Sequence, residues 1–330
     1  MVSSIKSFYI SYDAVNESNT FGAGDFISGR IFLEVSKEVK LSSLSVKAKG
    51  KAKVLWSERY GQVTVVYHAK EKYFSQERVL VQERAAGGAG EDYMTLINQG
   101  EEKYDSVLSP GIHVYSFTFQ IPQGNMPSSF KGCYGKIIYT LEAKLSRPMR
   151  VSSKAMAEFT FVSKPDVSIA HLMEPQFGTR SKNLKFLTSG NVSMDIQTEK
   201  MGYMQGEVLQ VVAQINNISS RIVTPKISLY QKQSFFAKGK RKLYIKKILK
   251  EKGESIPPGT HRSVTQQLTI PVDLPPSVLN CPILQVEYRL KVYLNVPFAK
   301  DPEIKLPLIV LHALSASGPM TQLNTPECFT

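Results

Sequence analysis

The chain has 330 residues, 42% of them hydrophobic, and at about 100 to 200 residues per domain this length favours two folded domains. Its longest apolar stretch, Leu306 to Leu314, is interrupted by Pro307 and His312, whereas a transmembrane helix needs about 18 apolar residues, so such a helix is excluded. The 41 basic and 28 acidic side chains leave a net charge of +13, which favours an anionic partner: lipid head groups, phosphorylated peptides or nucleic acid.

Alternating polar and apolar residues predict half-buried β-strands along the whole chain. In the segment Val114–Ile121, for example, Tyr115, Phe117 and Phe119 share one face. Strands are predicted at residues 27–35, 46–54, 114–121, 138–145, 208–215 and 286–294. Gly and Pro residues separate these runs, which is typical of antiparallel sandwiches. The alternation therefore predicts an all-β fold of antiparallel sandwiches or barrels, and the internal repeat of the chain favours two tandem, immunoglobulin-like β-sandwich domains.

The two halves of the chain repeat each other. A spacing of 17 residues separates Pro122 from Tyr139, and the same spacing separates Pro271 from Tyr288. The segments 24–25 and 206–207 are a second matching pair, and the first copy is expected to hold extra residues within 61–104, with a flexible loop at 85–92. We expect domains at residues 1–165 and 187–315, an inter-domain linker at 166–186 and a short C-terminal tail at 316–330.

Sequence motifs for nucleotide, zinc and hydrolase sites are missing. The Gly-Lys pairs at residues 50–51, 135–136 and 239–240 are not followed by the Ser or Thr of a P-loop. No His-Glu-x-x-His, Gly-x-Ser-x-Gly or paired Cys/His spacing occurs. The cysteines Cys133, Cys281 and Cys328 are expected to be reduced, buried thiols. We predict no catalytic residues, no metal and no cofactor; a hydrolase would need a site assembled from distant residues.

A stripe of four lysines is the first candidate binding site. Lys47, Lys49, Lys51 and Lys53 alternate with small apolar residues, so their ammonium groups lie on one face of a strand. Since like charges repel, this face is expected to be solvated or bound to an anion, and an acidic or phosphorylated partner is our hypothesis for that anion. The alternative is that acidic residues on adjacent strands screen it and that it serves solubility or edge protection.

The second candidate is the segment 238–252, with eight basic residues and one acidic residue. It fits a helix or a β-hairpin with a mobile basic loop. At about 1 kcal/mol per Lys or Arg near an anionic membrane, it suits contact with anionic lipid or phosphate, although a merely solvated face is the alternative. The candidate contacts are Lys238, Lys240, Arg241, Lys242, Lys246, Lys247 and Lys250. Because the aromatic residues are not interleaved with basic stripes, we expect no nucleic-acid partner.

Several short segments, in order, resemble the arrestin superfamily, and the α-arrestin family in particular. The first half contains Ser28–Val35, Gly50–Glu58 and Ser129–Gly132, and the second contains Thr188–Gly190, Gly202–Glu207, Asn216–Arg221 and Phe235–Lys240. The resemblance extends from about Lys6 to Leu311. It implies two arrestin-type β-sandwiches and a cytoplasmic, non-enzymatic adaptor, peripheral at the plasma membrane and endosomes.

In this family, adaptors bind the cytoplasmic tails of membrane proteins, including receptors and transporters, and direct them to ubiquitin-dependent endocytosis and endosomal protein transport. Ligase recruitment there uses Pro-Pro-x-Tyr motifs. Here the Pro-Pro pairs at residues 257–258 and 275–276 are followed two residues later by Thr260 and Val278, where the motif needs Tyr. Contact with ubiquitin ligases is therefore expected to be indirect. The alternative hypothesis is a structural coat or sorting-complex subunit, like the arrestin-fold subunit of retromer.

Overall fold

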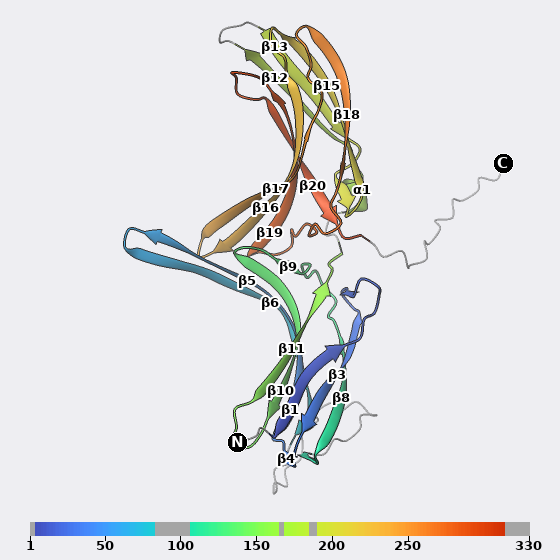
Figure 1. Cartoon of the computed structure of the whole chain (residues 1–330), viewed down its shortest axis with the longest axis vertical. Helices are drawn as coiled ribbons and strands as arrows, with labels where there is room; N and C mark the ends of the chain where they lie inside the picture. The colour runs from blue at the N-terminus through green and yellow to red at the C-terminus, as the bar shows by residue number, and fades with distance from the viewer. Residues whose placement is uncertain (1–3, 83–105, 165–167, 185–189, 314–330) are drawn as a thin grey trace, which may run out of the picture.

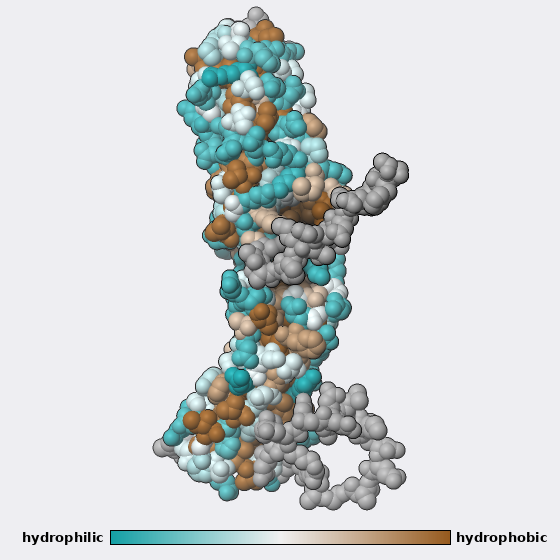
Figure 2. Space-filling view, turned by 90° about the vertical axis from the view of Figure 1, so that its right-hand side faces the viewer, coloured by the Kyte–Doolittle hydropathy of each residue, from teal (hydrophilic) through white to brown (hydrophobic). Residues whose placement is uncertain are grey.

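The structure is a computed structural model that describes residues 4–82, 106–164, 168–184 and 190–313. It is built almost entirely of β-strands, which form two sandwiches stacked along the long axis of the molecule (Figure 1). Figure 2 shows the resulting elongated outline, on which hydrophobic residues occur in scattered groups on the visible face. The predicted all-β fold class is confirmed.

The first sandwich contains two main sheets. One has the order β1 (Ile5–Tyr12), β3 (Phe26–Val35) and β8 (Gly111–Gln120). The other has the order β2 (Thr20–Phe21), β11 (Ser153–Phe161), β10 (Gly135–Ser146), β5 (Ser43–Tyr60) and β6 (Val63–Gln82), with β9 (Phe130–Lys131) beside β10. The short strands β4 (Val39–Lys40) and β7 (Val107–Leu108) pair with each other. Tyr115, Phe117 and Phe119 are buried between the sheets, as their alternation predicts.

The second sandwich follows the same plan. Its first sheet has the order β12 (Gln176–Leu184), β13 (Gly190–Thr198), β15 (Val208–Ser219) and β18 (Thr260–Thr269). Its second sheet has the order β14 (Gly202–Met204), β20 (Glu303–Leu311), β19 (Leu284–Asn295), β16 (Thr224–Ala237) and β17 (Lys240–Lys252). Both the helix α1 (Ile169–Leu172) and β12 lie inside the segment 166–186 that we expected to be a linker. Because β12 pairs with β13, the second sandwich starts before residue 187.

The repeated glycines occupy equivalent turns in the two sandwiches. Gly24 has φ +87° and Gly206 has φ +82°, a backbone conformation that favours glycine. At the first turn the Gly22 N–H donates to the Asp25 carboxylate over 2.7 Å. At the second turn the Met204 N–H donates to the Glu207 carboxylate over 2.8 Å. Each carboxylate therefore closes the turn that opens its strand, which explains why the sequence repeats this pattern.

The repeated tyrosines also have matching roles. The Tyr139 hydroxyl donates to the carbonyl oxygen of Pro127 at 2.7 Å, and the Tyr288 hydroxyl donates to that of Pro275 at 2.5 Å. Both rings are buried. The equal spacing in the sequence thus reflects a shared anchor between a core strand and the proline-containing loop before it.

Part of the segment 61–104, where we expected the extra residues of the first copy, forms a long strand. Residues 63–82 form β6, a 20-residue strand, whereas its counterpart β17 has 13 residues. The loop expected at 85–92 lies outside the described residues. The long hairpin β5–β6 projects sideways, next to the ends of β16 and β17 (Figure 1).

Contacts between these hairpins and the neighbouring loops join the two sandwiches. The rings of Tyr134 and Phe235 meet edge to face with centroids 5.7 Å apart. The Tyr73 hydroxyl donates to the Cys281 sulfur over 3.1 Å. Cys281 is buried, as we predicted for the cysteines, whereas Cys133 is exposed and Cys328 lies outside the described residues.

Candidate functional site: two basic surfaces

The lysine stripe lies on β5, in the interior of the N-terminal sheet. β5 pairs with β10 on one side and β6 on the other, so its lysines do not protect a sheet edge. Ala48 and Ala52 face the core, and the lysines face outward, as the alternation predicts. Gly50 is required between them, because a Cβ there would lie 2.5 Å from the ring of Tyr139. The core thus fixes the direction in which the lysines point.

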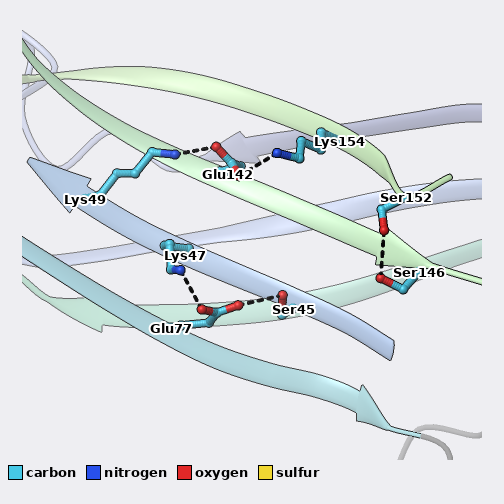
Figure 3. Close-up of polar contacts among 8 residues, drawn as sticks. All are labelled: Ser45, Lys47, Lys49, Glu77, Glu142, Ser146, Ser152 and Lys154. Atoms are coloured by element: carbon cyan, nitrogen blue, oxygen red, sulfur yellow. Dashed lines mark hydrogen bonds and ion pairs between the residues drawn. The ribbon is translucent and has the colours of Figure 1, made fainter. Parts of the chain in front are cut away.

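One half of the stripe is neutralised by carboxylates from the adjacent strands (Figure 3). Lys47 Nζ lies 2.6 Å from Glu77 on β6. Lys49 pairs with Glu142 on β10, and Lys154 on β11 lies 3.7 Å from the same carboxylate. The side chains of Lys49 and Glu142 are only 19% and 17% exposed. For Lys47 and Lys49, the structure therefore agrees with the alternative in which acidic neighbours screen the stripe.

Hydrogen bonds from the lysines lower the pKa values of both carboxylic acids. The bond from Lys49 is the main cause for Glu142, and the bond from Lys47 is the main cause for Glu77. Burial opposes both shifts but is the smaller effect. The lysines thus favour the ionised form of both acids, and this half of the stripe is a closed ion-pair network.

The other half carries positive charge without matching carboxylates. Lys53 lies opposite Lys70 on β6 and Lys136 on β10, and Lys51 lies opposite Lys72 on β6. Directly opposite residues of antiparallel strands have Cβ atoms about 4.5 to 5.5 Å apart and share a face. In the part of the chain that the structure describes, none of these five lysines forms an ion pair with a carboxylate. We call Lys51, Lys53, Lys70, Lys72 and Lys136 the lysine cluster.

The pKa of Lys51 shows the effect of this crowding. It is lowered first by partial burial and then by the charges of Lys53, Lys49 and Lys70, while Glu142 acts in the opposite direction. An anion bound among these groups would relieve their repulsion. The charge of the cluster therefore complements closely spaced negative charges.

The sequence pattern indicated Lys51 and Lys53 of the cluster but not Lys70, Lys72 and Lys136. Lys70 and Lys72 do alternate along the sequence, which indicates a shared face. Their position opposite Lys53 and Lys51, however, depends on a register shift between Gly50 and Lys51 in the pairing of β5 with β6. Lys136 is brought alongside by β10, more than 80 residues later in the chain.

The segment 238–252 forms a β-hairpin with β16, not a helix. Lys238 and Gly239 make the turn with φ values of +49° and +71°, and the basic residues after them lie on β17 and not in a loop. Two of the candidate lipid contacts instead touch the N-terminal sandwich. Lys238 donates to the carbonyl oxygen of Val66 over 2.9 Å, and Lys242 lies 3.0 Å from the Glu58 carboxylate. These two lysines help to hold the sandwiches together.

The other five candidate contacts on β17 remain at the surface. Arg241 donates to the Ser234 hydroxyl, and Lys247 lies over the ring of Tyr230, 5.9 Å from its centroid. Lys240, Lys246 and Lys250 are exposed. Within the described residues, no carboxylate forms an ion pair with any of these five side chains. β17 is thus a second basic surface, separate from the lysine cluster.

A cavity of about 1090 Å³ lies between the two sandwiches. It is lined by a histidine, serines and carboxylates, the types that a hydrolase would need. His312 Nδ1 donates to the Ala313 carbonyl oxygen, however, and the Ser277 hydroxyl accepts from the Val310 N–H. The lining carboxylates Asp25 and Glu207 close the two repeated turns. These side chains stabilise backbone structure, and their arrangement gives no support to hydrolase chemistry.

Across residues 4–82, 106–164, 168–184 and 190–313, no group of three His, Cys, Asp or Glu side chains is placed to hold a metal ion. Over the same ranges, no helix combines the length and apolar character needed to cross a membrane.

Comparison with known proteins places both sandwiches in one family. Residues 8–168 match "Arrestin (or S-antigen), N-terminal domain" and residues 188–314 match "Arrestin (or S-antigen), C-terminal domain". Mouse thioredoxin-interacting protein is 31% identical over 314 residues, which cover 94% of this chain and 74% of that protein. Human arrestin domain-containing protein 4 is 32% identical over 298 residues, which cover 88% and 68%. The chain therefore belongs to the arrestin family, as a relative of the α-arrestins, at about 30% identity to these proteins.

Proposed function

We propose that this chain is a non-enzymatic adaptor of the cytoplasm that acts in the endocytosis and endosomal transport of membrane proteins. Family membership supports a binding role, and the inter-domain cavity lacks an arrangement suited to catalysis. The single observation that carries the proposal is the lysine cluster. Its ammonium groups lie on the outer face of the sheet and form no ion pair with a carboxylate of the described residues. This charge suits an anionic partner. In this proposal the chain links cargo at membranes to ubiquitin-dependent sorting.

The cargo contact would be a cytoplasmic tail with acidic or phosphorylated residues. Of the lysines that the sequence pointed to, Lys51 and Lys53 would bind it directly. Lys47 and Lys49 are already paired with carboxylates, so they would contribute less. Within the α-arrestins, the segments quoted for the family resemblance favour arrestin domain-containing protein 3 or a close paralogue as the most similar member. Such a relationship would fit a role in binding cargo tails.

Two further partner classes stay predictions. Contact of β17 with anionic lipid would now depend on Lys240, Arg241, Lys246, Lys247 and Lys250, because Lys238 and Lys242 touch the other sandwich. Ubiquitin ligases would join through another protein, since neither Pro-Pro pair of this sequence forms a Pro-Pro-x-Tyr motif.

The proposal is tested in cells that lack the chain and re-express it. Proximity labelling identifies nearby membrane proteins, and surface biotinylation measures their uptake. We expect slower uptake without the chain, rescue by the wild type and no rescue by Lys51→Glu/Lys70→Glu. The matched control Lys37→Glu/Lys300→Glu changes the charge equally at exposed sites outside the cluster and should rescue. Unchanged uptake of every labelled protein would overturn the proposal, and a partner purified at fixed stoichiometry without cargo would favour a coat subunit.

A further inference from the structure

The strand β17 ends its sheet and leaves one main-chain edge unused. It pairs with β16, and no strand in the described part of the chain pairs with its other side. Every second N–H and C=O of such a strand points away from the sheet and can accept another strand. None of its 13 residues is buried. The edge is therefore open to a partner.

The charge of β17 is not a requirement of the fold, because the repeated sandwich supplies a comparison. In the N-terminal sandwich, β6 occupies the equivalent place at the end of its sheet. The 13 residues of β17 include seven basic and one acidic, whereas the 20 residues of β6 include three basic and two acidic. The same architecture thus tolerates a nearly neutral edge strand, and the positive charge of β17 points to its partner.

The positive charges flank the edge on both faces of the sheet. Lys246 lies opposite the buried Gln231, on the core side, whereas Lys247 lies opposite Tyr230, on the outer side. Consecutive residues of a strand point to opposite faces, which accounts for the change of face between these two lysines. A flat membrane would meet one face of the sheet at a time. An extended peptide added along the edge would lie between both sets of ammonium groups.

Apolar contacts are available at the same edge. Leu243 and Ile245 are 44% and 56% exposed and lie two residues apart, on one face of the strand. A second copy of the chain is a poor occupant, because pairing two β17 edges would place lysines against lysines. The charge instead complements an acidic chain.

We propose that β17 accepts an extended acidic peptide of a partner protein as an added strand along residues 243–252. Main-chain hydrogen bonds would fix the peptide, as in other strand-addition complexes. Lys246, Lys247 and Lys250 would pair with its Asp and Glu side chains on both faces. This surface is distinct from the lysine cluster, so the proposal does not depend on the cargo contact there.

The test uses a fluorescent peptide of about ten residues with alternating Glu and Val, long enough to cover residues 243–252 one for one. A matched peptide is N-methylated at five consecutive central amides, so that it keeps its charge and loses donors on both edges. Binding is measured by fluorescence anisotropy, and protection of the protein's amides is measured by hydrogen exchange. We expect slower exchange within residues 243–252 and roughly tenfold or weaker binding of the methylated peptide, because several hydrogen bonds are lost.

Protein variants provide the second arm. Lys246→Glu/Lys250→Glu should weaken binding about tenfold or more, since it reverses charge beside the edge. Lys37→Glu/Lys144→Glu changes the charge equally on the other sandwich and should leave binding within about twofold of the wild type. Equal binding of both peptides, or peptide binding without protection of residues 243–252, would overturn the proposal. Protection of this strand by vesicles of phosphatidylserine and phosphatidylcholine, but not by the peptide, would assign the edge to lipid instead.

Discussion

Replacing Glu142 with Gln should make the protein less stable and a better anion binder. The Glu142 carboxylate is largely buried, accepts a hydrogen bond from Lys49 and lies 3.7 Å from Lys154. Without this charge, the half-buried Lys49 ammonium keeps only a neutral acceptor. A charged hydrogen bond contributes about 1.5 to 3 kcal/mol, and partial solvent screening reduces this, so we expect the free energy of unfolding to fall by about 1 to 2 kcal/mol.

Anion binding should change in the opposite direction. Lys49 precedes Lys51 by two residues, roughly 7 Å along the strand. One more unpaired positive charge at this distance from an anion in the lysine cluster contributes roughly 0.6 kcal/mol in water, or about a threefold gain in affinity. The gain should disappear at high salt, because at about 1 M ionic strength the screening length falls to about 3 Å.

Urea denaturation measures the first effect. Calorimetric titration with a doubly phosphorylated peptide, at low and high salt, measures the second. Glu34→Gln is the matched control, since Glu34 lies on the other sheet of the same sandwich and pairs with Lys6. It should change neither quantity appreciably. Weaker binding by Glu142→Gln at low salt, or unchanged stability, would refute the reasoning.

Three further predictions concern the fold. Tyr139→Phe and Tyr288→Phe should each lower the free energy of unfolding by about 1 to 2 kcal/mol in urea denaturation, because each removes a hydroxyl donor from a proline carbonyl; a loss from only one would contradict their equivalence. Gly50→Val should lower the melting temperature, because overpacking costs about 1 to 3 kcal/mol, and an unchanged value would contradict the close contact with Tyr139. Hydrogen bonding by Lys291 is the main cause that lowers the pKa of Glu303 to about 2, so this stabilisation is complete above about pH 4.5 and is lost as the pH falls towards 2. Thermal melts of Glu303→Gln and wild type should therefore converge over that range, and a constant gap would contradict the shift.

The repeated sandwich was predictable because its landmarks have local causes. The turns at Gly24 and Gly206 need a left-handed glycine, and the tyrosine anchors need a fixed spacing to the preceding loop. Such constraints produce a recognisable pattern in the sequence. The pattern of β12 is weaker, since Gln176 and Leu184 are its only buried residues and a strand of mostly polar residues resembles a linker.

The candidate site was only partly predictable, because its chemistry depends on pairings between strands. The alternation of Lys47 and Lys51 fixes their common face, but the partner of each is set by β6 and β10. Glu142 neutralises one end of the stripe, and Lys136 adds charge at the other, although only six residues separate them on the same strand. The contact between Lys242 and Glu58 depends on how the two sandwiches meet, which no local pattern indicates.

The most direct test of the adaptor hypothesis is the affinity of the purified chain for one cargo tail, in phosphorylated and unphosphorylated form. The tail comes from a membrane protein identified by proximity labelling. We predict tighter binding of the phosphorylated tail by the wild type, and equally weak binding of both forms by Lys51→Gln/Lys53→Gln/Lys70→Gln. Equal affinity of the wild type for the two tails, or a phosphate preference that survives in the variant, would contradict the role of the lysine cluster.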